Sequence, residues 1–260
     1  MRTEERKMKA RKILKVIGCV VGVLIVLGVA YLIYWLQPMP AAQEAVEACQ
    51  RDSQVDVSIS DTAIAFIPKQ PIDTGLIFYP GAKVDPRAYA IYMRTFAEQG
   101  YPAFIVKMPL NLAFLGVGQA SGIIKEHPEI KNWVIGGHSL GGTFASVFAA
   151  EHASQIRGLL LYASYPASDI RKQLAQMPVL SISGSNDGLA TPAKVENART
   201  FLPDHTRYIV VKGGIHSYFG DYGLQKGDGQ ASISRSQANE QISSASLEFL
   251  RAISKPEKGN

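Results

Sequence analysis

The stretch Trp133-Val-Ile-Gly-Gly-His-Ser-Leu-Gly-Gly142 holds a serine between two glycines, Gly137 and Gly141, directly after an apolar run. The apolar run is typical of a buried strand, and the residues after it favour a helix. A serine lifted off a strand end needs a sharp turn, in which side chains two residues away on either side would collide. The amides and dipole of the helix N-terminus then lie beside the serine oxygen. The pattern predicts Ser139 as a nucleophile and the Leu140 N–H as a donor to an oxyanion.

A base and an orienting acid, which a nucleophilic serine needs, are both available downstream. Asp187 follows the β-rich run Val179–Ser183, and His216 follows the last such run, Arg207–Val211. Loops at the carboxyl edge of a parallel sheet lie side by side, however far apart they are in sequence. We therefore predict a triad in the order Ser139, Asp187, His216. Two other acids are less well placed substitutes for the carboxylate: Asp169 and Asp221.

The chain after residue 54 alternates between short β-rich runs and helical stretches. The expected strands are Val55–Ile59, Ala63–Ile67, Leu76–Tyr79, Ala103–Lys107, Trp133–Gly136, Gly158–Ala163, Val179–Ser183 and Arg207–Val211. The expected helices are 86–99, 117–127, 140–152, 192–201 and 235–253. Several strands are apolar on both faces, which favours a parallel sheet covered by helices on both sides, while the first two strands favour an antiparallel hairpin at its edge. We expect one α/β domain over residues 53–254.

An uncharged run of 21 residues, Val16–Leu36, precedes this domain. As a helix it is roughly 31 Å long, enough to cross a bilayer core of about 30 Å. All seven basic residues of positions 1–15 lie before it, so the positive-inside rule predicts a cytoplasmic N-terminus and an extracytoplasmic domain. We expect a basic tail at 1–15, a membrane anchor at 16–36, a stalk at 37–52 and a C-terminal tail at 255–260. A secretory signal cleaved near Ala41 and Ala42 is the alternative.

The charge of the chain argues against nucleic-acid binding. The formal net charge is +5, but residues 1–15 hold seven of the 27 basic side chains and two of the 22 acidic ones, which leaves 20 of each for the rest. A balanced domain carries no broad basic surface. The five histidines show no metal-ligand spacing, so no metal or other cofactor is expected. The chain has two cysteines, and Cys19 lies in the apolar run, so the domain has no second cysteine with which Cys49 could form a disulfide. We therefore expect Cys49 to be an unpaired structural thiol, and a reactive thiol is the alternative.

The residues quoted above resemble the α/β-hydrolase superfamily, over about residues 74–253. The resemblance is to small bacterial dienelactone-hydrolase-like and carboxylesterase-like serine hydrolases, and the dienelactone-hydrolase-like ones often carry cysteine at the position of Ser139. It implies a mostly parallel eight-stranded sheet with helices on both faces. The segment Phe78-Tyr-Pro-Gly-Ala-Lys83 takes the place of the family's first oxyanion loop, with Pro80 where a histidine is usual. The resemblance therefore implies that the backbone of Ala82, or Lys83, gives the second oxyanion donor.

The substrate site is expected to be open, because only Ser164–Met177 separates two strands between which lipases of this architecture often carry a long lid. The loops hold apolar residues that could line an acyl pocket or simply pack: Tyr165, Tyr218, Phe219, Leu110, Leu112 and Phe114. His138 is expected to pack away from the turn. The implied activity is hydrolysis of a carboxylic ester or related small-molecule or lipid-like acyl bond. An acyltransferase, a hydrolase of cell-surface lipids or polymers, and a non-catalytic binding module stay open.

Overall fold

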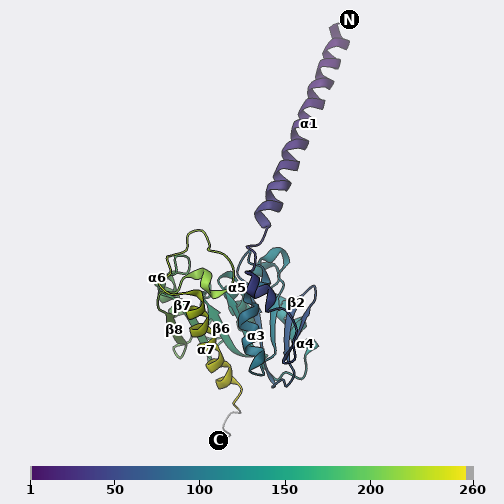
Figure 1. Ribbon diagram of the computed structural model, residues 1–260. Coiled ribbons are helices and arrows are strands. Elements are labelled where there is room, and N and C mark those ends of the chain that lie inside the picture. Colours follow the sequence, from purple (N-terminus) through teal and green to yellow (C-terminus); the bar gives the residue numbers. More distant parts are fainter. Residues whose placement is uncertain (1, 256–260) are drawn as a thin grey trace. The chain divides into compact units, whose positions relative to one another are not determined.

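The computed structural model describes residues 2–255 and divides between Gln37 and Pro38 into two units (Figure 1). The first unit is one helix, α1 (Arg2–Leu36). Within its stretch Arg11–Leu36, the most apolar 18 residues have a mean hydropathy of 2.9, and the stretch is long and apolar enough to cross a membrane. A signal sequence passes the same test. The predicted C-terminal tail lies, except for Lys255, outside the described residues.

The second unit is built on one eight-stranded sheet in the order β1-β2-β4-β3-β5-β6-β7-β8. The pairs β1–β2 and β2–β4 are antiparallel and the other five are parallel. This confirms the predicted sheet and its edge hairpin. The strands are β1 (Val55–Ile59), β2 (Ala63–Pro68), β3 (Thr74–Tyr79), β4 (Ala103–Val106), β5 (Asn132–His138), β6 (Ile156–Tyr162), β7 (Val179–Gly184) and β8 (Arg207–Val211).

Helices cover both faces of the sheet because the central strands are buried on both sides. Helices α3 and α7 pack on one face, while α4 and α5 pack on the other (Figure 1). The α-helices of this unit are α2 (Gln43–Glu47), α3 (Ala90–Glu98), α4 (Ala120–Glu126), α5 (Leu140–Glu151), α6 (Pro192–Asn197) and α7 (Arg235–Ile253). The 3-10 turns are η1 (Pro86–Tyr89), η2 (Pro109–Asn111), η3 (Ala113–Leu115), η4 (Val117–Gln119), η5 (Ala198–Phe201) and η6 (His216–Phe219).

The parallel register brings the loops that carry the candidate site to one edge of the sheet. Tyr79, the last residue of β3, lies opposite Gly137 of β5. On the other side, His138 of β5 lies opposite Tyr162 of β6. The segment between β6 and β7 contains only turns and bends, so the cap is short. The loops after β3, β5, β7 and β8 therefore meet at the carboxyl edge of the sheet.

Within the expected stalk, residues 37–52, Met39 and Ala42 form backbone hydrogen bonds to the domain. The N–H of Met39 donates to the carbonyl of Lys83 over 2.6 Å, and the carbonyl of Met39 accepts from the N–H of Asp85 over 2.9 Å. The N–H of Ala42 donates to the carbonyl of Asp221 over 2.7 Å. The segment therefore joins the loop after β3 to the loop after His216, two of the loops at the carboxyl edge.

Candidate active site

The turn at Ser139 has the strained geometry that the glycines around it suggested. Ser139 caps α5 with φ 53° and ψ −126°, a conformation that an L-residue rarely adopts. A Cβ on Gly137 would lie 2.6 Å from the carbonyl carbon of Gly141, and one on Gly141 would lie 2.1 Å from the carbonyl oxygen of Tyr79. Both glycines are therefore required by close backbone packing between β5, α5 and the end of β3.

The strain at this turn predicts an inverted preference between glycine and alanine. The free energy of unfolding of Ser139→Gly is expected to be about 1 kcal/mol higher than that of Ser139→Ala, because glycine accepts positive φ without penalty. Chemical denaturation of the two full-length variants measures the difference. Ser146, inside α5, is the matched control, since there glycine should be about 1 kcal/mol less stable than alanine. If the glycine variant were less stable than the alanine variant at both positions, the backbone strain at Ser139 would be contradicted.

Asp187 and His216 form a buried pair at the ends of β7 and β8. Nδ1 of His216 donates to Oδ2 of Asp187 over 2.9 Å, and both side chains are almost completely buried. The other carboxylate oxygen, Oδ1, accepts from the N–H groups of Leu189 and Ala190 over 2.8 and 2.7 Å. The carboxylate is thus held at both oxygens, which fixes the imidazole with its proton on Nδ1 and leaves Nε2 as the acceptor.

The free nitrogen of His216 lies close to the turn that carries Ser139. Among the described residues, Nε2 of His216 is buried and has no hydrogen-bond partner. The ring of His138, the residue before Ser139, lies 4.6 Å from the ring of His216 between centroids. Ser139 itself is half-buried. A buried, unpaired acceptor beside this turn is suited to receiving a proton from a hydroxyl.

Asp228, which no motif in the sequence singles out, supports the pair. Its carboxylate accepts from the N–H of His216 over 3.0 Å and from the N–H and hydroxyl of Ser217, each over 2.8 Å. It also accepts from the N–H of Gly188, next to Asp187, over 3.3 Å. Burial acts to raise the pKa of Asp228, but the hydrogen bonds from Ser217, Gly229 and His216 outweigh it and the pKa is lowered. Asp228 therefore ties the histidine loop to the acid loop as a carboxylate.

In the loop after β3, one backbone N–H has no hydrogen-bond partner among the described residues. The N–H of Gly81 donates to the hydroxyl of Tyr89 over 2.9 Å, and that of Lys83 donates to the carbonyl of Asn111 over 2.8 Å. No hydrogen bond joins the N–H of Ala82 to any other residue that the structure describes. Of the two predicted candidates, Ala82 is therefore the one whose N–H is available to an oxyanion.

Leu140 is the first residue of α5, so its N–H is one of the amides that a helix leaves unpaired at its N-terminus. Gly141, the next residue, would place a Cβ 2.3 Å from the carbonyl oxygen of Pro80. The start of α5 and the loop after β3 are therefore in direct backbone contact, and the two predicted oxyanion donors come from neighbouring segments.

The two substitute acids do not contact His216 in the described structure. Asp169 is exposed and pairs with Arg171, whose hydrogen bonds lower the pKa of Asp169 to about 2. Asp221 is buried and accepts from Asn239 over 3.1 Å, and burial raises its pKa. Of the three predicted acids, only Asp187 is paired with the histidine.

Cys49 is partly buried and unpaired, and burial raises its pKa to about 11. A thiol with this pKa is mostly protonated at neutral pH and reacts slowly as a nucleophile. Its thiol lies 3.6 Å from the carbonyl oxygen of Ala45, a contact within the segment that precedes β1. The residue thus acts as a small packing group.

The residues expected to contact substrate fall in different environments. Tyr165 and Tyr218 are half-buried, and the guanidinium of Arg235 lies 4.6 Å from the centroid of the Tyr218 ring. Phe219 is fully buried, and its ring stacks on that of His138, 6.2 Å away. Its side chain is therefore part of the core, because the loop after β8 turns it inward. The exposed apolar side chains of the loop after β4 include Leu110 and Phe114, while Leu112 is half-buried.

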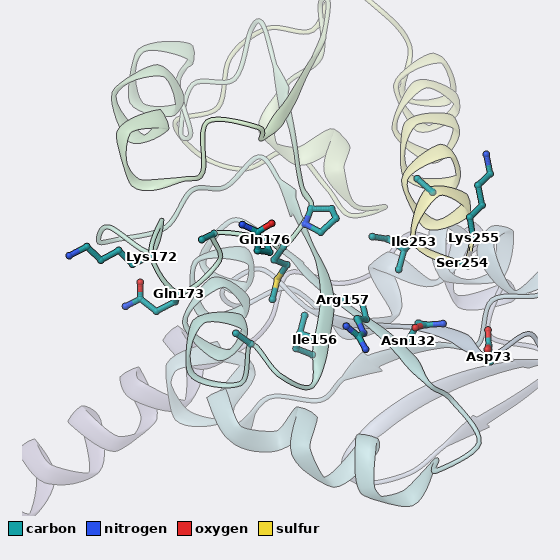
Figure 2. A pocket seen from close by; sticks show the side chains of 15 residues that line it. Asp73, Asn132, Ile156, Arg157, Lys172, Gln173, Gln176, Ile253, Ser254 and Lys255 are labelled. Carbon is teal, nitrogen blue, oxygen red and sulfur yellow. The ribbon is translucent and has the colours of Figure 1, made fainter. Parts of the chain in front are cut away.

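A cavity of about 880 Å³ lies at the opposite edge of the sheet (Figure 2). Its lining includes Asp73, Asn132 and Ile156, which precede or begin β3, β5 and β6, together with Ile253 at the end of α7. These are the amino ends of the parallel strands, whereas Asp187 and His216 follow the carboxyl ends. Among residues 2–255, no group of three or more His, Cys, Asp or Glu side chains could hold a metal ion.

Solved structures with the same fold cover most of this chain. Protein TT1662 from Thermus thermophilus is 15% identical with a TM-score of 0.59, and the match covers 78% of this chain and all of that one. The dienelactone hydrolase from Anabaena variabilis is 16% identical with a TM-score of 0.56, covering 76% of this chain and 98% of that one. Est1E from Butyrivibrio proteoclasticus is 12% identical with a TM-score of 0.53, and the match covers 76% of this chain and 100% of that one. At these identities the matches show the fold.

The sequence gives a more specific relationship than the solved structures do. No curated protein matches the chain. The model of the alpha/beta hydrolase family matches residues 75–240, which is more than half of the chain and includes the buried Asp187–His216 pair. The chain belongs to the alpha/beta hydrolase family.

Proposed function

We propose that the protein is a serine hydrolase that cleaves a carboxylic ester or a related acyl bond through Ser139, His216 and Asp187. The observation that carries this proposal is the buried pair of Asp187 and His216, held at 2.9 Å with Nε2 of the histidine unpaired among the described residues. That nitrogen lies beside the turn whose strained serine follows His138. The likeness to a dienelactone hydrolase supports the same reaction class by analogy of fold.

The reaction begins with attack of the Ser139 hydroxyl on the acyl carbon, while Nε2 of His216 takes the proton. Asp187 stabilises the imidazolium through the hydrogen bond at Nδ1. The developing negative charge on the carbonyl oxygen is stabilised by the backbone N–H groups of Ala82 and Leu140. His216 returns the proton to the leaving alcohol, and an acyl-enzyme remains. Water then attacks the acyl-enzyme, with His216 again as the base, and Ser139 is regenerated.

The test is a panel of p-nitrophenyl esters of rising acyl length, combined with labelling by a fluorophosphonate probe. The full chain in detergent should hydrolyse at least one ester and should be labelled once, on Ser139, as peptide mass spectrometry would show. Analysis of products with water and with alcohol acceptors separates hydrolysis from acyl transfer. A protein that binds esters without turnover or labelling would be a binding module instead.

We also propose that α1 anchors the enzyme in the cell membrane, with residues 1–15 in the cytoplasm and the catalytic domain on the other side. Residues 37–52 would then connect anchor and domain. The packing of this segment favours an anchor over a cleaved signal, because cleavage near Ala41 and Ala42 would release Met39 from its hydrogen bonds to Lys83 and Asp85. Those hydrogen bonds support the loop that carries Ala82.

The anchor predicts an intact chain in the membrane fraction. After expression, we expect alkaline carbonate to leave the protein in the membrane pellet, and its mass to be that of all 260 residues, apart from removal of the initiator methionine. The physical reason is that the uncharged run Val16–Leu36 is longer than the apolar core of about 7 to 15 residues that a typical signal sequence has. A soluble product that begins near Ala42 would contradict the anchor and leave the hydrolase proposal untouched.

A further inference from the structure

A buried polar pair, Tyr89 and His138, lies between three segments of the candidate site. Both side chains are completely buried. The hydroxyl of Tyr89 lies 2.9 Å from Nδ1 of His138 and accepts from the N–H of Gly81, also over 2.9 Å. The His138 ring lies 4.6 Å from the ring of His216. The pair thus contacts the loop after β3, the turn before Ser139 and the candidate catalytic base.

The direction of each hydrogen bond follows from the donors present. The N–H of Gly81 can only donate, so the Tyr89 oxygen accepts it, and among the described residues Nδ1 of His138 is the one acceptor within reach of the Tyr89 hydroxyl proton. Burial, followed by the nearby charge of His216, holds the pKa of His138 well below its usual range. Burial also raises the pKa of Tyr89 far above neutral pH. A protonated hydroxyl therefore donates to Nδ1 of a neutral His138, whose proton is on Nε2.

This pair fixes the orientation of the loop that carries the candidate oxyanion donor. Gly81 is packed against it so closely that a Cβ would lie 2.8 Å from Nδ1 of His138 and 3.0 Å from the Tyr89 hydroxyl. The next N–H along the chain, that of Ala82, is the one without a partner among the described residues. Rotation of the loop would break the hydrogen bond at Gly81, so the Tyr89 hydroxyl restricts where the Ala82 N–H can point.

The neutral state of His138 also matters to His216. During catalysis the His216 ring becomes positively charged, and a second positive charge 4.6 Å away would oppose that step. A hydroxyl that donates to Nδ1 stabilises the neutral imidazole of His138.

We propose that Tyr89 and His138 are positioning residues of the hydrolase: the pair orients the Ala82 N–H toward the oxyanion and keeps an uncharged ring beside His216. The inference rests on the proposed function and adds two residues to its machinery. Neither one touches the reacting atoms. A purely structural role for the pair would affect stability alone, whereas positioning changes kcat at constant substrate affinity.

The test is Tyr89→Phe in the full chain, with Tyr162→Phe as matched control. Tyr162 is equally buried, and its hydroxyl pairs with that of Ser246 on α7 over 2.6 Å, away from the loop after β3. We expect Tyr89→Phe to lower kcat for a p-nitrophenyl ester about tenfold, a fraction of what loss of an oxyanion donor costs, with KM within about twofold. Tyr162→Phe should keep the wild-type kcat and KM, although it should lose about as much thermal stability as Tyr89→Phe does.

A second pair of variants covers the case in which Tyr89→Phe does not fold. His138→Asn offers an amide oxygen near the position of Nδ1 and should keep most of kcat, whereas His138→Leu should lose it about tenfold, like Tyr89→Phe. An active, labelled wild type with unchanged kcat in Tyr89→Phe and His138→Leu would overturn the inference and leave the proposed function standing. A wild type that neither turns over esters nor is labelled overturns both.

Discussion

Ser139→Ala is expected to lower kcat for ester hydrolysis by about 10⁴-fold or more and to abolish fluorophosphonate labelling. The variant keeps the backbone of the turn but has no oxygen to attack the acyl carbon. Residual turnover would come only from bound water acting beside the oxyanion donors, and it would carry no covalent intermediate. Initial rates at saturating p-nitrophenyl ester and intact mass after exposure to the probe measure the two effects.

Ser146→Ala is the matched control for this substitution. Ser146 lies on the same helix, α5, and is buried, and its hydroxyl donates to the carbonyl of Thr143 over 2.6 Å. The control removes a hydroxyl close in sequence to Ser139 but away from the turn, so kcat should stay within about twofold. Labelling of Ser139→Ala at the wild-type rate would show that the probe reacts elsewhere and would remove Ser139 as the nucleophile.

The sheet was predictable because its strands are short, apolar and separated by helical stretches. The expected bounds of β1 and β8 agree with the structure at both ends, and helix α7 agrees at 235–253. The segment 38–52 was harder, because its prolines and alanines are typical of a linker. Its contacts with Lys83 and Asp221 are made by backbone groups, and side-chain patterns carry no information about those.

The Asp187–His216 pair was predictable for a related reason, since each of the two residues lies just past a recognisable strand end. The role of Asp228 was not predictable, because the residue lies in a glycine-rich loop without the hydrophobic periodicity of a strand or helix. An acid between Gly227 and Gly229 was the only signal, and turn residues give the same signal. Its role depends on where the loop folds back onto Ser217.

The directions of the loop side chains were also not predictable from the sequence. His138 was expected to pack, and it does, but its packing partners include Tyr89 and His216. Phe219 was expected either to line an acyl pocket or to pack, and the short turn η6 directs its ring into the core. Both outcomes depend on tertiary contacts that the order of residues does not reveal.

Asp187→Asn is expected to lower kcat by about 10⁴-fold while the fold is kept. The amide oxygen of asparagine can still accept from Leu189 and Ala190, as Oδ1 does now. The amide nitrogen then replaces Oδ2 and faces Nδ1 of His216, where two donors cannot meet. The imidazole must carry its proton on Nε2, and that tautomer cannot take the proton of Ser139. Steady-state kinetics of the variant measure the loss of kcat, and thermal unfolding measures whether the fold is kept.

The two substitute acids give the controls for this prediction. Asp169→Asn removes a surface carboxylate that pairs with Arg171, and Asp221→Asn removes a buried one that accepts from Asn239. Neither carboxylate contacts His216, so both variants should keep kcat within a few-fold. A large loss in Asp221→Asn together with a small one in Asp187→Asn would move the acid to the loop after His216. The hydrogen bonds at both oxygens of Asp187 argue for the opposite result, because they orient this carboxylate toward Nδ1 before any substrate arrives.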